Sequence, residues 1–150
     1  MNSDISKIAM LSMSITNSYK LYNKFHKIHD LKPYVSVILY RLHWLKKMTI
    51  KELCHQTSMP KQSISKGIHL LQAQGYLKLE QDPADNRVYY VWLTSAGEKY
   101  AQEKIGDMVE IEQAVAKDLG DENIAELSKL MQAWNQAFEA HLNQKMKEKE

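Results

Sequence analysis

The hydrophobic pattern of the chain changes from helical to alternating at Gly75. Residues 61–74 place apolar side chains every three or four positions, which is typical of one face of an α-helix. Residues 76–93 are instead rich in β-branched and aromatic residues and contain the turn Asp82-Pro83-Ala84-Asp85-Asn86. This order predicts a helix that ends at the glycine and leads directly into a β-hairpin. The helix face expected to be buried carries Ile64, Ile68 and Leu71.

The rest of the chain is predicted to be helical. Only five Gly and three Pro interrupt it, and they fall where elements are expected to end. Thr49 and Glu52 have the spacing of a capping box, which begins a short helix, and Lys46-Lys47-Met48 separates that helix from the preceding apolar stripe. The predicted fold class is α+β, mostly α. The predicted helices cover about 5–27, 33–45, 49–56, 61–74, 94–119 and a last stretch after 121.

Composition limits the kind of protein further. With 150 residues, 44% hydrophobic and 25% charged, the chain has the size of one globular domain, with or without an assembly arm. No apolar run approaches the ~20 residues of a membrane span. No signal peptide is readable after Met1, so the expected location is the cytoplasm, with no membrane partner. The single cysteine, Cys54, excludes an internal disulfide and a zinc site built from several thiolates.

The net charge of +2 is unevenly distributed along the chain. Residues 1–40 carry +3 and residues 41–90 carry +4, whereas residues 91–150 carry −5. A basic middle followed by an acidic, helical tail indicates a polyanionic partner for the middle. The alternative is a solvated surface on which charges cluster by chance.

The last predicted helix carries an apolar seam at alternating three- and four-residue steps. Together with the other long terminal helices, this seam exceeds what a middle domain of ~60 residues can cover. We therefore expect a second copy of the chain to bury it, and the alternative is a three-helix layer within one chain. The seam residues are Ile124, Leu127, Met131, Trp134 and Phe138.

A short helix, a brief turn, a second helix and a hairpin follow one another in the order of a winged helix-turn-helix. An α-helix fits the ~12 Å major groove of B-DNA, where polar side chains at its start meet base edges. Gln62 suits adenine, Lys66 suits guanine or phosphate, and the serines suit a base or the backbone. The alternative is an ordinary solvated amphipathic helix. The predicted DNA-contacting residues of this helix are Lys61, Gln62, Ser63, Ser65 and Lys66.

The turn of the hairpin carries a second DNA-binding candidate. Arg87 follows the turn directly, where a guanidinium can enter the narrow, electronegative minor groove. Asp85, two residues earlier, is predicted to hold and orient it, because a carboxylate pairs well with the planar guanidinium. The alternative is a surface ion pair, which contributes little to stability.

These motifs resemble the MarR family of dimeric bacterial transcription regulators over essentially the whole chain. The resemblance implies a winged helix-turn-helix with a two- or three-stranded wing and long N- and C-terminal dimerisation helices. It implies one domain, 1–150, with a DNA-binding lobe at 34–94 and a helical dimerisation region at 1–33 and 95–150. The motifs that carry it are Thr49-Ile50-Lys51-Glu52-Leu53, Ser63-Ile64-Ser65-Lys66, Gln74-Gly75-Tyr76-Leu77, Asp82-x-x-Asp85-x-Arg87 and Val91-x-Leu93-Thr94-x-x-Gly97.

The resemblance also implies a function. Family members are homodimers whose recognition helices enter successive major grooves of a pseudo-palindromic operator, with each wing in a flanking minor groove. They usually repress, and often leave DNA on binding a small phenolic or lipophilic molecule or a metal, or on cysteine oxidation. Here Leu79-Glu80-Gln81 stands where the family often has Arg, and Lys66 stands where Arg is frequent. We expect weaker phosphate attraction, since each lost contact lowers the salt slope by ~0.9.

A small-molecule pocket is implied between the DNA-binding lobe and the dimerisation helices. Aromatic faces with a few polar tips suit a flat aromatic acid. The alternatives are that these side chains pack at an interface, or that the pocket is empty or vestigial. The candidates are Tyr19, Tyr22, His26, Tyr40, His43 and Trp44.

Other functional classes find less support in the sequence. His26, His29 and Asp30 have the spacing of part of a metal site, but the remaining histidines do not complete a set of ligands, so solvated histidines are expected. Cys54 is predicted to pack in the core and not to sense oxidants, because it shares a helix face with Leu53. No phosphate-binding glycine loop, Gly-x-Ser-x-Gly elbow or His-Glu-x-x-His helix is present, so neither an enzyme nor a cofactor is expected. The remaining alternative is a winged-helix module that binds protein without binding duplex DNA.

Overall fold

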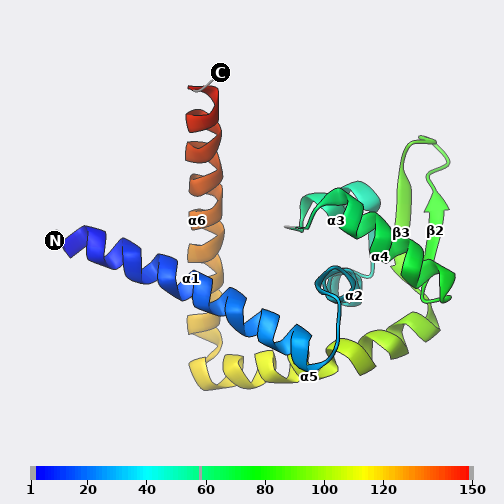
Figure 1. The fold of residues 1–150 in the computed structure, drawn as a ribbon, viewed down its shortest axis with the longest axis horizontal. Helices are drawn as coiled ribbons and strands as arrows, with labels where there is room; N and C mark the ends of the chain where they lie inside the picture. Colours follow the sequence, from blue (N-terminus) through cyan, green and yellow to red (C-terminus); the bar gives the residue numbers. More distant parts are fainter. Residues whose placement is uncertain (1–2, 58, 149–150) are drawn as a thin grey trace. The chain divides into compact units, whose positions relative to one another are not determined.

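The computed structural model describes residues 3–57 and 59–148, and these form two compact units that divide between Met108 and Val109. The described residues are mostly helical with a small antiparallel sheet, which confirms the predicted fold class. The long helix α5 contributes its first part to one unit and its remainder to the other. The elements, labelled in Figure 1, are α1 (Ser3–Ile28), α2 (Pro33–Leu45), β1 (Lys47–Thr49), α3 (Ile50–His55), α4 (Lys61–Ala73), β2 (Leu77–Gln81), β3 (Tyr89–Leu93), α5 (Ser95–Leu119) and α6 (Asp121–Lys147).

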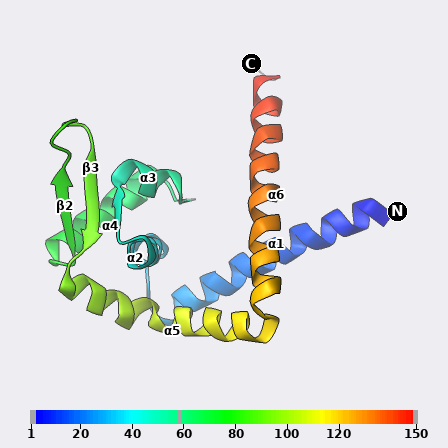
Figure 2. The ribbon, with the colours of Figure 1, turned by 180° about the vertical axis from the view of Figure 1, so that it is seen from behind.

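The sheet of the first unit contains the predicted hairpin and one further strand. Its order is β1-β3-β2, and both pairings are antiparallel. The hairpin pairs Leu77 with Leu93 at its base, and Figures 1 and 2 show β2 and β3 projecting together to a loop. Three strands agree with the predicted two- or three-stranded wing, but the sequence does not predict where the third strand lies, because Lys46-Lys47-Met48 indicates only an interruption between helices. The three residues of β1 are too few for an alternating pattern to stand out.

The core of the first unit is built around α2. Ile38, Leu39 and Leu42 on this helix are fully buried, and α2 packs against α4 and the sheet. The predicted buried face of α4 is confirmed, because Ile64 and Leu71 are fully buried and Ile68 is 3% exposed. Figures 1 and 2 show α2 enclosed by the elements around it. The other buried hydrophobic residues are Leu31, Val35, Met48, Leu53, Leu77, Val91, Leu93, Ala101, Ile105 and Met108.

The short helix α3 begins with the predicted capping box. The Glu52 backbone N–H donates to Thr49 Oγ1 at 3.1 Å, and the Thr49 N–H donates to Glu52 Oε2 at 2.8 Å. These bonds satisfy donors that a helix N-terminus otherwise leaves without partners. Hydrogen bonds from Thr49, the backbone bond first, hold the pKa of Glu52 below its ordinary value.

The junction between the hairpin and α5 explains the last of the family-like motifs. The Thr94 hydroxyl donates to the Gly75 carbonyl at 2.7 Å and accepts the Gly97 N–H at 3.0 Å. The Thr94 N–H donates to the Tyr76 carbonyl at 3.0 Å. The Tyr76 ring also stacks on Tyr100, with centroids 4.2 Å apart. The start of α5 is therefore tied closely to the end of α4 and the start of β2.

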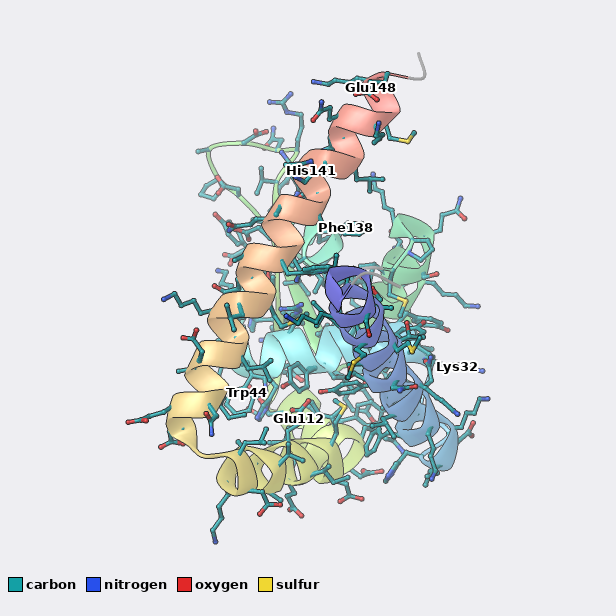
Figure 3. All side chains as sticks on the ribbon, turned by 90° about the vertical axis from the view of Figure 1, so that its left-hand side faces the viewer. Lys32, Trp44, Glu112, Phe138, His141 and Glu148 are labelled. Carbon is teal, nitrogen blue, oxygen red and sulfur yellow. The ribbon has the colours of Figure 1, made fainter. Side chains whose placement is uncertain are left out.

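The second unit contains the end of α5 and all of α6. No described residue of α6 is buried within the chain. The predicted seam is partly open: Leu127 is 51% exposed and Phe138 is 59% exposed, whereas Ile124, Met131 and Trp134 are half-buried. Figure 3 shows side chains projecting from α6 along its length, with Phe138 and His141 labelled. No helix in the described part of the chain has both the length and the apolar character that crossing a membrane requires.

Candidate nucleic-acid interface

The helix α4 presents the predicted polar residues on its accessible side. Lys61, Gln62 and Lys66 are exposed, and Ser63 and Ser65 are half-buried. The first turn of α4 holds no acidic residue, and no side chain caps its N-terminus. A helix N-terminus of this kind carries partial positive charge, which favours phosphate.

The inner side of α4 approaches α2 closely at Gly67, where a side chain would force a neighbour to move. A Cβ on Gly67 would lie 2.5 Å from Ile38 Cδ1 and 3.0 Å from Tyr34 Cδ2. Both neighbours belong to α2, and Gly67 itself is buried. The accessible face of α4 is thus set by contact of its opposite face with the core.

Lys66 also touches α2. Its Nζ lies over the Tyr34 ring, 5.9 Å from the centroid, at the outer limit of a cation–π interaction. This contact limits where the ammonium group is found while leaving the residue exposed. To contact guanine or phosphate, the Lys66 ammonium group would reach out from its place over the Tyr34 ring.

The loop between β2 and β3 is organised by two aspartates. Asp82 Oδ1 accepts the N–H groups of Ala84 at 2.7 Å and Asp85 at 3.2 Å, which folds the turn. Asp85 then accepts the Arg87 N–H at 3.0 Å, Nε at 3.1 Å and Nη2 at 3.3 Å. The predicted Asp85–Arg87 pair is therefore confirmed as a geometric feature. The hydrogen bonds from Arg87, side chain first, hold the pKa of Asp85 below its ordinary value.

Asp85 orients the Arg87 side chain but does not shield it from solvent. Its side chain is 90% exposed, compared with 41% for Asp85. The guanidinium is consequently held in direction by the carboxylate while remaining open to solvent. An exposed ion pair of this kind adds little to stability, so its geometry matters more than its energy.

The base of the hairpin carries a cationic residue that the sequence analysis missed. Lys47 on β1 lies over the rings of Tyr90, at 4.8 Å, and Trp92, at 4.6 Å. It also pairs with Glu80 on β2 at 3.3 Å. Lys47 thus connects all three strands on one face of the sheet. Only the three-dimensional pairing brings it there, because β1 and β3 are more than 40 residues apart in the chain.

The six predicted effector-pocket residues lie on two helices, α1 and α2. Tyr40 and His43 lie close to Trp44 at the C-terminal end of α2, with ring centroids 6.4 Å and 5.3 Å from it. Trp44, labelled in Figure 3, is 52% exposed. Tyr19 and Tyr22 are exposed on α1, at 63% and 44%.

His26 is placed differently from the other candidates. Its Nε2 lies 3.0 Å from the hydroxyl of buried Ser36, which joins α1 to α2. Its Nδ1 is enclosed and has no hydrogen-bond partner among the residues that the structure describes. Burial lowers the pKa of His26, which favours the neutral imidazole. The predicted pocket remains a prediction.

His43 is engaged with α5. Its Nδ1 lies 3.1 Å from Glu98 Oε2, and Lys46 Nζ lies 3.2 Å from the other oxygen of the same carboxylate. A sequence separation of 55 residues hides this contact from pattern analysis. It adds a polar link between the end of α2 and the start of α5.

The weaker candidates have ordinary structural surroundings. His29 stacks on Phe25 with centroids 4.1 Å apart and lies 3.8 Å from Asp107. Within residues 3–57 and 59–148, no three His, Cys, Asp or Glu side chains are grouped as metal ligands would be. Cys54 is half-buried and packs against the core, as expected from its helix face.

Comparison with known proteins finds a family model that matches part of the chain. The MarR family model matches residues 29–87. The HTH-type transcriptional regulator TcaR of Staphylococcus aureus is 26% identical over 100 residues, which are 65% of this chain and 66% of TcaR. The match therefore spans just under two thirds of the length of that relative.

Solved structures share the fold over most of the chain. NMB1585, a MarR family regulator from Neisseria meningitidis, matches with a TM-score of 0.79 at 23% identity, over 92% of this chain and 97% of its own. NadR in complex with 4-hydroxyphenylacetate matches with a TM-score of 0.69 at 20% identity, over 84% of this chain and 89% of its own.

The exposed helix α4, the projecting wing and these matches define a winged helix-turn-helix protein. The chain is similar to the MarR family in sequence over residues 29–87 and shares the fold of a MarR family regulator over most of its length. The relatives that match, TcaR and NMB1585, are transcriptional regulators.

Proposed function

We propose that this protein is a homodimeric, sequence-specific regulator that binds a pseudo-palindromic operator in double-stranded DNA. The observation that carries the proposal is the wing geometry: Arg87 is held by Asp85 and 90% exposed, in the same unit as the polar face of α4. A preoriented guanidinium suits the narrow minor groove, where negative potential is enhanced.

The recognition helix α4 enters the major groove in this proposal. Gln62 and Lys66 are exposed and have the chemistry to bond base edges, whereas the phosphate backbone is contacted chiefly by Lys61. Ser63 and Ser65 are half-buried, so their hydroxyls reach a base or phosphate only at close approach. Asp85 acts indirectly, by directing Arg87.

The dimer is supported by the apolar surface that the single chain leaves open. Leu127 and Phe138 on the α6 seam are more than half exposed, as are Leu130 and Met146 on the same helix. Exposed apolar residues at such spacing are typical of an interface between helices. Two copies related by a two-fold axis would present two recognition helices to two half-sites. The helical regions 1–33 and 95–150 therefore serve dimerisation, and 34–94 serves DNA binding.

A small aromatic acid is the proposed effector, and its binding releases a repressor from DNA in the cytoplasm. NadR, which shares the fold, is known in complex with 4-hydroxyphenylacetate. The candidate residues Tyr19, Tyr22, His26, Tyr40, His43 and Trp44 supply aromatic faces and polar tips. Among them, His26 has an enclosed ring nitrogen that a ligand hydroxyl or carboxylic acid would satisfy.

Selection of duplexes from a random DNA pool tests the proposal. The purified protein should enrich a pseudo-palindrome with half-sites about one helical turn apart. Arg87→Ala should bind the selected operator more weakly and with a smaller salt slope, by about 0.9 per lost phosphate contact. No enrichment at low salt would contradict DNA binding and favour the protein-interaction alternative.

A further inference from the structure

Arg41 and Arg87 are the two arginines of the chain, and the proposed function uses only Arg87. Arg41 lies on α2 and is half-buried. Its Nη2 donates to the backbone carbonyl of Gln56 at 2.9 Å. Gln56 is the C-cap of α3, so this bond joins the central helix to the C-terminal end of α3.

The chemistry of that carbonyl explains why an arginine is suitable. The last carbonyls of a helix have no partner within the helix and carry partial negative charge. A guanidinium supplies both a donor and a positive charge there, while its stem lies along the packed surface of α2. The Gln56 N–H is already used in its own helix, by the Glu52 carbonyl at 2.8 Å.

The same face of α2 also contacts the middle of α4. Tyr34, Ile38 and Arg41 follow one another at steps of four and three residues, which places them on one face of the helix. Tyr34 and Ile38 meet α4 at Gly67, where no Cβ fits without movement. Arg41 holds Gln56 at the end of α3, which precedes α4 in the chain. Contacts of α2 at two separated points, Gln56 and Gly67, fix the direction of α4, whereas a single contact would let α4 tilt.

We propose that Arg41 is a positioning residue of the recognition helix: it anchors the C-terminal end of α3 and so fixes the angle at which α4 meets the major groove. This inference rests on the proposed DNA-binding function. Arg41 acts on DNA through α4, and its loss misplaces the exposed side chains of α4 relative to the bases. The rival role for an arginine at this position is a direct phosphate contact.

The salt dependence of operator binding separates the two roles. Arg41→Met keeps the apolar stem and removes every donor, and Arg41→Lys keeps a charged donor. For Arg41→Met we expect a loss of roughly tenfold in the ratio of operator to nonspecific affinity, comparable to mismatching about one base pair. The salt slope should stay at the wild-type value, and Arg41→Lys should recover part of the ratio. Lys99→Met, on the exposed surface of α5, is the charge-matched control and should change neither quantity.

A DNA-free measurement completes the test. The amides of Ser63 and Ile64 bond the Pro60 carbonyl at 2.9 Å and 3.2 Å in the first turn of α4. Their hydrogen exchange should be faster in Arg41→Met and unchanged in Lys99→Met. Wild-type exchange rates at these amides, or an unchanged affinity ratio, would overturn the inference. A salt slope reduced as in Arg87→Ala would show a phosphate contact instead, and failure of the wild type to select any duplex would contradict the proposed function itself.

Discussion

The backbone carbonyl of Tyr76 occupies the space that a Cβ on Gly97 would need. A carbonyl cannot move aside as a flexible side chain can, and this one also accepts the Thr94 N–H. We expect Gly97→Ala to lower the free energy of unfolding by about 2–3 kcal/mol, the upper part of the usual range of overpacking. Urea unfolding measures the change.

Gly106 on the same helix is the matched control. A Cβ there would lie 2.7 Å from Gln102 Nε2, the far end of a flexible side chain that can turn away. Gly106→Ala should be neutral or stabilising by up to about 1 kcal/mol, because alanine favours the helix. Equal losses in the two variants would mean that helix α5 does not depend on its approach to Tyr76.

Thr94 is predicted to stabilise the same junction through its hydroxyl. The hydroxyl bonds the Gly75 carbonyl and the Gly97 N–H, so Thr94→Val leaves both groups without this partner. We expect a loss of about 1–2 kcal/mol from the lost cap. Thr94→Ser retains the hydroxyl and should lose much less. Thermal unfolding of the two variants side by side measures the difference, and an equally stable Thr94→Val would show that the hydroxyl contributes nothing.

The sequence predicts contacts that are local and misses those that are distant. Asp85 and Arg87 are two residues apart, and Thr49 and Glu52 three, so spacing alone was enough to predict both pairs. The bond from His43 to Glu98 spans 55 residues and leaves no periodic trace. β1 could not be predicted because three residues are too few to show the alternation of apolar and polar side chains that marks a strand.

The roles of candidate functional residues are likewise predictable where they depend on local pattern and not where they depend on distant contacts. The polar face of α4 is predictable because burial of Ile64 and Leu71 fixes the register of the whole helix. The contact of Arg41 with the Gln56 carbonyl was not predictable, since an arginine on a helix has no sequence signal that identifies a backbone partner. Residue type alone predicts the effector candidates, and they lie on α1 and α2.

The capping box of α3 gives a pH dependence with a definite sign. The pKa of Glu52 is lowered by its bonds from Thr49, so the folded state favours the carboxylate. Its contribution to stability is fully present above the ordinary value of 4.5 and is lost as the pH falls through the lowered pKa. Unfolding of the wild type and Glu52→Gln should therefore differ most near neutral pH and converge in acid. Glu126→Gln, at an exposed position on α6, is the control, and a difference independent of pH would contradict this role of the carboxylate.

Asp82 is predicted to matter for DNA binding without touching DNA. Its carboxylate accepts the Ala84 and Asp85 N–H groups and so shapes the loop that presents Arg87. Its bond from the Tyr90 hydroxyl also raises the pKa of that tyrosine. Asp82→Ala should weaken operator binding several-fold, because the wing must then be ordered on binding. Its salt slope should match the wild type, whereas Arg87→Ala should lower it, as fluorescence anisotropy at several salt concentrations would show. A lowered slope in Asp82→Ala would mean that the loop itself loses a phosphate contact.

The α6 seam provides the test of the dimer. Leu127→Glu and Phe138→Glu place a charge on an apolar surface that association would bury, and an unpaired buried charge is strongly unfavourable. We expect the dimer dissociation constant to rise at least about 100-fold, the effect of losing a central interface residue. Gln136→Glu adds the same charge to α6 away from the seam and should leave the dimer intact. Sedimentation equilibrium measures the association of all three variants.

DNA binding by the seam variants shows whether the α6 seam is the dimer interface or only an exposed apolar surface. A monomer retains one recognition helix and one wing, so it should bind a single half-site with unchanged salt slope per protomer but lose the preference for two half-sites at fixed spacing. If Leu127→Glu and Phe138→Glu remain dimeric, the α6 seam is not the interface, and the exposed apolar residues of α1, such as Ile8 and Leu11, become the next positions to substitute.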